Sequence, residues 1–240
     1  MNFINQQDQT QTFKGDATIV KNFMSNVFSW MGIAMAITAL TAYFFANDAS
    51  LMRLLVSETG GMSILGWVVM LAPLGLVLWL SRGFQRMSYG TLVIVFGIFS
   101  ILMGMSLSFI LLAYTGASVA QTFVTTAMMF GIMAIVGFTT KTDLTKFGSI
   151  LIMALIGIII ASIINMFLGS GMMDYIISFI GVLIFTGLIA YDVQKLKRIG
   201  SGLMYQNQDA NKLAIMGALS LYLDFINLFL FLLRFMGNRR

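Results

Sequence analysis

Residues 213–233 read LAIMGALSLYLDFINLFLFLL, an apolar stretch with a single charged residue, Asp224, near its middle. It is long enough to cross a bilayer as a helix, because a spanning helix needs about 20 apolar residues. A charged side chain at the bilayer centre costs roughly 2.5–3.5 kcal/mol on insertion scales. An asparagine would make a structural contact without that cost, so Asp224 is a candidate functional residue.

The rest of the chain repeats this apolar pattern. Hydrophobic residues make up 59% of the 240 residues and the mean hydropathy is +0.92, values that predict a polytopic membrane protein. The sequence predicts seven transmembrane helices, at residues 23–46, 62–80, 89–114, 117–138, 147–168, 175–191 and 213–233. Only Thr115 and Gly116 separate the third segment from the fourth, and the sixth is short unless it continues past Asp192.

We therefore expect an all-α membrane protein with three parts. These are a polar cytoplasmic tail (1–22), a single seven-helix transmembrane domain (23–236) and a short basic tail (237–240). The first segment is uncharged and longer than the apolar region of a signal peptide, which favours a retained helix.

The basic residues predict the orientation. Ten lie in the amino-terminal tail and alternate connections, namely Lys14, Lys21, Arg82, Arg86, Lys141, Lys146, Lys195, Lys197, Arg198 and Lys212. Four lie on the other side, namely Arg53, Arg234, Arg239 and Arg240. The positive-inside rule then places the amino terminus in the cytoplasm and, after seven spans, the carboxyl terminus outside. The alternative, favoured by the basic tail, is a re-entrant last segment with both termini inside.

Several classes of function lack the residues they need. The chain has no cysteine and no histidine, which removes disulfides, thiolate metal sites, the usual zinc and haem ligands and the commonest general base. We expect neither an enzyme nor a bound cofactor. The pI of about 9.6 is explained by basic loops that face an anionic lipid leaflet, and the sequence does not support a nucleic-acid partner.

Polar residues of the last segment fall on one helical face. Ser220, Asp224, Asn227 and Arg234 are spaced by four, three and seven residues, which places them along one side at 3.6 residues per turn. Such a stripe belongs inside a bundle, where it faces a cavity or a partner. Ser220, Asp224 and Asn227 are candidate ion-pathway residues, although Ser220 and Asn227 equally suit hydrogen bonds to neighbouring helices.

Two residues outside this helix have both a functional and an ordinary interpretation. Asp192 ends the sixth segment, where it is either functional or an interfacial carboxylate paired with Lys195. Arg82, at the end of the second segment, is by default a positive-inside anchor. In the third segment a small-residue stripe, formed by Gly97, Ser100, Gly104 and Ser108, predicts close helix packing.

Four motifs carry a resemblance to a known family. Residues 218–229, ALSLYLDFINLF, look like the signature helix of the transmembrane Bax inhibitor motif family. Ala190-Tyr191-Asp192 resembles the sixth-helix motif of that family, and residues 137–145 (GFTTKTDLT) and 96–99 (FGIF) resemble two internal motifs. The resemblance extends from about residue 20 to the end of the chain, and the short tail is most similar to the bacterial branch.

The resemblance implies seven helices with the last one central among the other six. It also implies a pH-sensitive calcium leak in the bacterial inner membrane, in which Asp192 and Asp224 share a proton. Arg82 would assist gating, with Ser81 as the alternative alignment. We expect the shared proton to close the cytoplasmic end at lower pH, and repulsion between the carboxylates to open it at higher pH. Two carboxylates would hold calcium only weakly and in passing.

Two other functions fit the same residues. One is a membrane-embedded regulator that binds another membrane protein, such as a membrane protease, and uses the tail 1–22 as a docking segment. The other is a proton-coupled carrier, since an aspartate in a midmembrane stripe would serve it equally well.

Overall fold

The structure is a computed structural model that describes residues 3–57, 61–202 and 209–239, with side chains from Thr18 onward. In this part of the chain the helices are α1 (Phe3–Asn47), α2 (Ala49–Leu55), α3 (Ile64–Gly83), α4 (Tyr89–Ala113), α5 (Gly116–Thr139), α6 (Thr145–Leu168), α7 (Gly171–Gly202) and α8 (Ala210–Met236). All except α2 contain a stretch long and apolar enough to span a membrane. The prediction of an all-α protein with seven spans is therefore confirmed.

Three boundaries differ from the prediction. The sixth span is not short, because α7 continues past Asp192 to Gly202. This extension buries Val193, Leu196 and Gly200, and it packs on α1, so tertiary contacts sustain a helix that the apolar run alone would end. The short helix α2 lies in the connection after the first span, and the predicted tail 1–22 is already helical from Phe3.

Side-chain caps set where the spanning helices begin. The hydroxyls of Ser63, Ser88 and Thr115 accept hydrogen bonds from backbone N–H groups in the first turns of α3, α4 and α5, and Asp209 does so for α8. These bonds satisfy N–H groups that have no partner within the helix. The cap on Thr115 explains how a very short connection separates α4 from α5.

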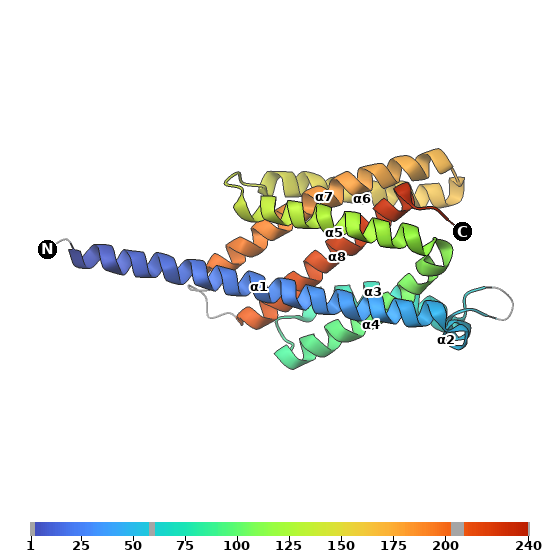
Figure 1. The fold of residues 1–240 in the computed structure, drawn as a ribbon, viewed down its shortest axis with the longest axis horizontal. Helices are drawn as coiled ribbons and strands as arrows, with labels where there is room; N and C mark the ends of the chain where they lie inside the picture. The colour runs from blue at the N-terminus through green and yellow to red at the C-terminus, as the bar shows by residue number, and fades with distance from the viewer. Residues whose placement is uncertain (1–2, 58–60, 203–208, 240) are drawn as a thin grey trace.

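Helix α8 occupies the centre of the bundle. Most of its side chains are buried, and it packs on α1, α4, α5 and α7 (Figure 1). The helix is continuous from Ala210 to Met236, and the two termini lie at opposite ends of the molecule (Figure 1). A continuous helix of this length favours a last segment that crosses the bundle over the re-entrant alternative.

A buried hydrogen-bond network joins α8 to the first and third spans. The Thr38 hydroxyl donates to the backbone carbonyl of Ser100 at 2.9 Å and lies 2.8 Å from the Tyr222 hydroxyl. Gly104 makes this approach possible, because a Cβ there would lie 2.6 Å from the carbonyl oxygen of Thr38. The predicted packing role of the small-residue stripe is confirmed at Ser100 and Gly104, whereas Gly97 has no such neighbour.

The carboxyl-terminal residues are held against the turn between α4 and α5. Thr115 donates its backbone N–H to Asn238, and the Arg239 guanidinium donates to the Tyr114 hydroxyl at 3.3 Å. Asp174 at the start of α7 pairs with Arg234 at 3.4 Å and with Arg239 at 3.9 Å. Two of the four basic residues that the sequence predicts on the outer side, Arg234 and Arg239, therefore share an acidic partner.

Candidate functional site

The structure brings the two predicted aspartates together on α7 and α8. The Ser220 hydroxyl donates to Oδ2 of Asp192 at 2.6 Å, and Asp224 lies one turn further along α8. The carboxyl groups of Asp192 and Asp224 are near enough to interact through charge. Ser220 thus links Asp192 to the same face of α8 that carries Asp224.

The two carboxyl groups have different surroundings. Asp224 is 7% exposed, and its Oδ2 atom has no hydrogen-bond partner among the described residues. Asp192 is half-buried. The described residues include no ion pair between Asp192 and Lys195, so the interfacial pairing considered for Asp192 is not formed. Lys195 instead acts on Asp224 through its charge.

Asp192, Ser220 and Asp224 together form the aspartate cluster. Two cavities lie on either side of this cluster. The first, about 260 Å³, lies between α3, α7 and the beginning of α8, and its lining includes Asp192 and Lys195. The second, about 470 Å³, lies between α6, α7 and the middle of α8, and its lining includes Asp224 and Asn227. Both cavities are lined by Ser220 and Leu223. The cluster therefore stands between a cavity near the amino-terminal end of the bundle and one deeper within it.

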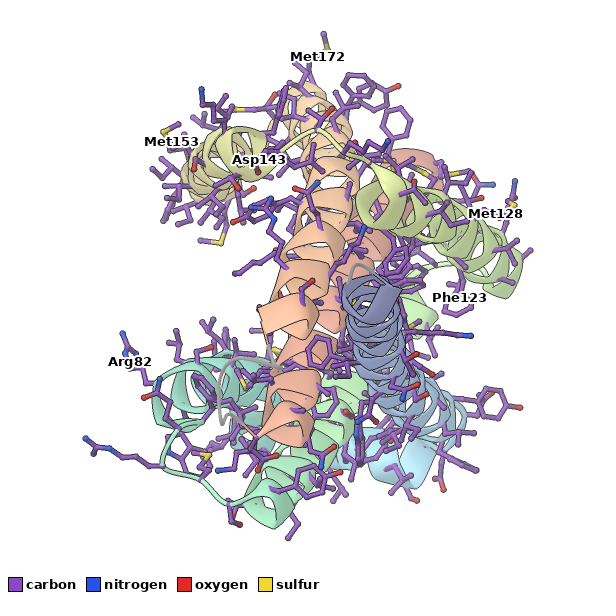
Figure 2. All side chains as sticks on the ribbon, turned by 90° about the vertical axis from the view of Figure 1, so that its left-hand side faces the viewer. Arg82, Phe123, Met128, Asp143, Met153 and Met172 are labelled. Carbon is purple, nitrogen blue, oxygen red and sulfur yellow. The ribbon has the colours of Figure 1, made fainter. Side chains whose placement is uncertain are left out.

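Arg82 does not join this cluster. Its side chain is exposed and points away from the bundle (Figure 2), and it forms no ion pair within the described ranges. Its neighbour Ser81 lines the first cavity together with Asp192. Of the two alignments left open by the sequence, the structure places Ser81 nearer to the pair.

Asn227 and Ser162 complete the polar lining of the second cavity. The Asn227 side-chain amide donates to the backbone carbonyl of Leu223 at 2.8 Å, and the Ser162 hydroxyl donates to that of Ile158 at 2.7 Å. The sequence predicted Asn227 at this face but missed Ser162. A lone hydroxyl within the apolar run 150–164 was the available signal, but it does not identify the helix that it faces.

The segment of α7 after Asp192 is anchored to the loop between α5 and α6. Gln194 is buried, accepts the backbone N–H of Leu144 at 2.9 Å and donates to the carbonyl of Thr142 at 2.7 Å. Arg198, one turn on, forms an ion pair with Asp143 at 2.6 Å. Residues 137–145, singled out in the sequence, thus fix the position of α7 beside the aspartate cluster.

Asp143 lies outside the spans and carries a shifted pKa. Hydrogen bonds from the side chain and the backbone of Thr145, followed by one from Arg198, lower the pKa of the Asp143 carboxyl to about 2. The anchor is therefore charged throughout the neutral pH range, and a pH response near neutrality has to come from other groups.

The cluster offers few ligands to a metal ion. No group of three or more acidic, histidine or cysteine side chains suited to metal binding occurs within residues 3–57, 61–202 and 209–239. A cation that passed this point would meet two carboxylates, with the remaining ligands supplied by water, hydroxyls or amides.

Comparisons with known proteins agree with the family resemblance found in the sequence. Residues 20–240 match the family model described as inhibitor of apoptosis-promoting Bax1. The chain is 46% identical over 222 residues to the inner membrane protein YbhL of Escherichia coli (strain K12), covering 92% of this chain and 93% of that protein. It is also 42% identical over 233 residues to an uncharacterized protein of Borreliella burgdorferi, covering 97% and 98% of the two chains.

Proposed function

Because this chain belongs to the family of the inhibitor of apoptosis-promoting Bax1, as an integral membrane protein, we propose that it is a pH-sensitive calcium leak channel of the bacterial inner membrane. The gate is the pair Asp192 and Asp224, and the amino terminus is cytoplasmic. The inner-membrane location draws support from the similarity to YbhL, which is described as an inner membrane protein.

One observation carries this proposal. The aspartate cluster lies between two cavities that share Ser220 and Leu223 as lining residues, so a small displacement of α7 against α8 would join them. A gate made of two carboxyl groups responds to pH, because neighbouring acids titrate as a unit. A chain without histidine must build any response near neutral pH from groups of this kind.

In the closed state one proton is shared between the carboxyl groups, and Ser220 holds Asp192 against α8. Loss of that proton at higher pH leaves two negative charges in a site of low dielectric constant. Their repulsion separates α7 from α8 at this level and creates an anionic site for a cation. Two carboxylates bind calcium weakly, and weak binding allows the ion to leave.

Calcium flux into proteoliposomes, with a fluorescent indicator inside and the purified full-length chain in the membrane, tests this function. We expect flux that increases as pH rises through neutrality and that empty liposomes lack. Absence of flux at every pH, together with purification of a stoichiometric membrane-protein partner, would favour the regulator instead. Proton uptake that depends on an added organic substrate would favour the proton-coupled carrier.

A further inference from the structure

The second cavity has a chemical character that a passage for small inorganic ions does not explain. Eight of its twelve lining residues are apolar, and the four polar ones are Ser162, Ser220, Asp224 and Asn227. Its volume of about 470 Å³ lies within the roughly 300–1,000 Å³ typical of pockets for drug-sized ligands. A calcium ion prefers six to eight oxygen ligands, which walls of this composition do not supply.

The polar groups of this cavity mainly offer acceptor atoms. The hydroxyl protons of Ser162 and Ser220 are already donated to Ile158 and Asp192. The Oδ2 atom of Asp224 is buried and without a hydrogen-bond partner among the described residues. Serine oxygens keep free lone pairs after donating, and a carboxylate only accepts. The lining therefore selects a group that donates several hydrogen bonds and carries positive charge.

The cavity lies on the one side of α8 that the other helices leave partly uncovered. Side chains at Leu213, Met216, Ser220, Leu223, Asn227 and Leu230 are only half-buried and recur every three or four residues. On this side α3 packs on α4 and α6 packs on α7, and Figure 2 shows α6 at the upper left and α3 at the lower left, apart from each other and beside α7 and α8. Two residues of the cavity lining, Ile159 and Ile163, are half-exposed on the lipid-facing side of α6, so a molecule dissolved in the bilayer can reach the cavity.

From these observations we propose that the second cavity binds a lipophilic amine that enters from the membrane. The ammonium group donates to the carboxyl group of Asp224 and to the oxygens of Ser162 and Ser220, while the alkyl body lies along Ile158, Leu188 and the other apolar residues. The charge of Lys195 reaches Asp224 from the first cavity, but the Lys195 side chain is not among the residues that line the second one and does not occupy the site. Binding does not require that the protein conduct calcium.

Binding of n-octylamine to the full-length protein in lipid nanodiscs tests the proposal, with the thermal unfolding midpoint as the readout. We expect n-octylamine to raise the midpoint at lower concentrations than n-octanol, which lacks the charge, and n-octyltrimethylammonium, which lacks N–H donors. Asp224→Asn should raise the half-maximal concentration of the amine by at least about tenfold, because it removes one partner of a buried charge pair. Equal potency of all three compounds overturns the proposal.

Two further variants distinguish binding of the amine in the cavity from its general partitioning into lipid. Ser162→Phe fills the cavity and should abolish the effect of n-octylamine, whereas Ile160→Phe, at a half-exposed position on α6 outside the lining, should preserve it. A photoreactive analogue of n-octylamine keeps the test valid if Ser162→Phe does not fold. It should label α6 and α8 around Ser162 and Asn227 in the native protein, and labelling spread evenly over lipid-facing residues contradicts the site. Amine binding without calcium flux would leave this inference standing and refute the proposed channel.

Discussion

The carboxyl group of Asp224 is buried without a full set of hydrogen-bond partners. One oxygen has no partner among the described residues, and an unpaired buried polar group costs about 1–3 kcal/mol or more when charged. The neighbouring Tyr222 has the opposite character, since its hydroxyl is paired and its ring packs edge-on against Phe96 and Phe99. These two residues of α8, separated by Leu223, thus differ: the hydroxyl of Tyr222 is paired within the bundle, whereas one oxygen of Asp224 is without a partner among the described residues.

Removal of the Tyr222 hydroxyl tests whether its hydrogen bond stabilises the bundle. We expect Tyr222→Phe to lower the free energy of unfolding by about 0.5–1.5 kcal/mol, the usual contribution of one buried hydrogen bond. Thr38 keeps its bond to Ser100, which limits the loss. The unfolding midpoint in detergent measures the effect, with Tyr175→Phe, an exposed tyrosine of α7, as the matched control. Equal stability of Tyr222→Phe and the native chain would refute the role of the network.

At the scale of elements, close contact between α5 and α7 fixes the position of Asp192 along the bundle. A Cβ at Gly137 would lie 2.8 Å from the Cα of Ala190, two residues before Asp192. We predict that Gly137→Ala lowers stability by about 1–3 kcal/mol, because the clash is with backbone that cannot rotate away. Gly131 on the same helix has open space around it, so Gly131→Ala should be neutral or stabilising by up to about 1 kcal/mol. Thermal unfolding of both variants measures the difference, and equal effects would contradict this packing.

The anchor between α7 and the α5–α6 loop has its own pH dependence. The pKa of Asp143 is lowered to about 2 from about 3.9 in an unfolded chain, so its stabilising contribution is complete above the unfolded value and is lost as pH falls towards the folded one. We expect Asp143→Asn to lower the unfolding midpoint near neutral pH and to converge on the native chain as pH falls through about 2. A constant difference between the two curves down to that pH would show that ionisation of Asp143 is not the cause.

Sequence patterns predicted the elements well but not the contacts between them. Seven apolar runs identify seven spans because the bilayer imposes a length on each helix. The extension of α7 was missed, since it depends on packing of Val193 and Leu196 rather than on an apolar run. Asp192 and Asp224 were predicted as a pair only through the family resemblance. The positions of Ser162 and Arg82 depend on helix rotation, which spacing within one helix does not determine.

At the scale of the whole molecule, the structure predicts opposite locations for the two termini. Seven spans and a continuous α8 predict this, and the positive-inside rule applied to the basic loops predicts a cytoplasmic amino terminus. Fusion of a reporter active only in the periplasm should give signal at the carboxyl terminus and none at the amino terminus. Signal from neither fusion, with cytoplasmic reporters active at both, would restore the re-entrant alternative.

The central claim is that Asp192 and Asp224 act by gaining and losing a proton. The most direct test is the pH profile of calcium flux into proteoliposomes for the native chain, Asp192→Asn and Asp224→Asn, with Asp174→Asn in the first turn of α7 as the matched control. We predict that native flux changes with pH by up to about tenfold per unit, the limit for gating by one proton. Both pair variants should fold and lose this dependence, and Asp174→Asn should retain it. A native pH profile in both Asp192→Asn and Asp224→Asn would contradict the account.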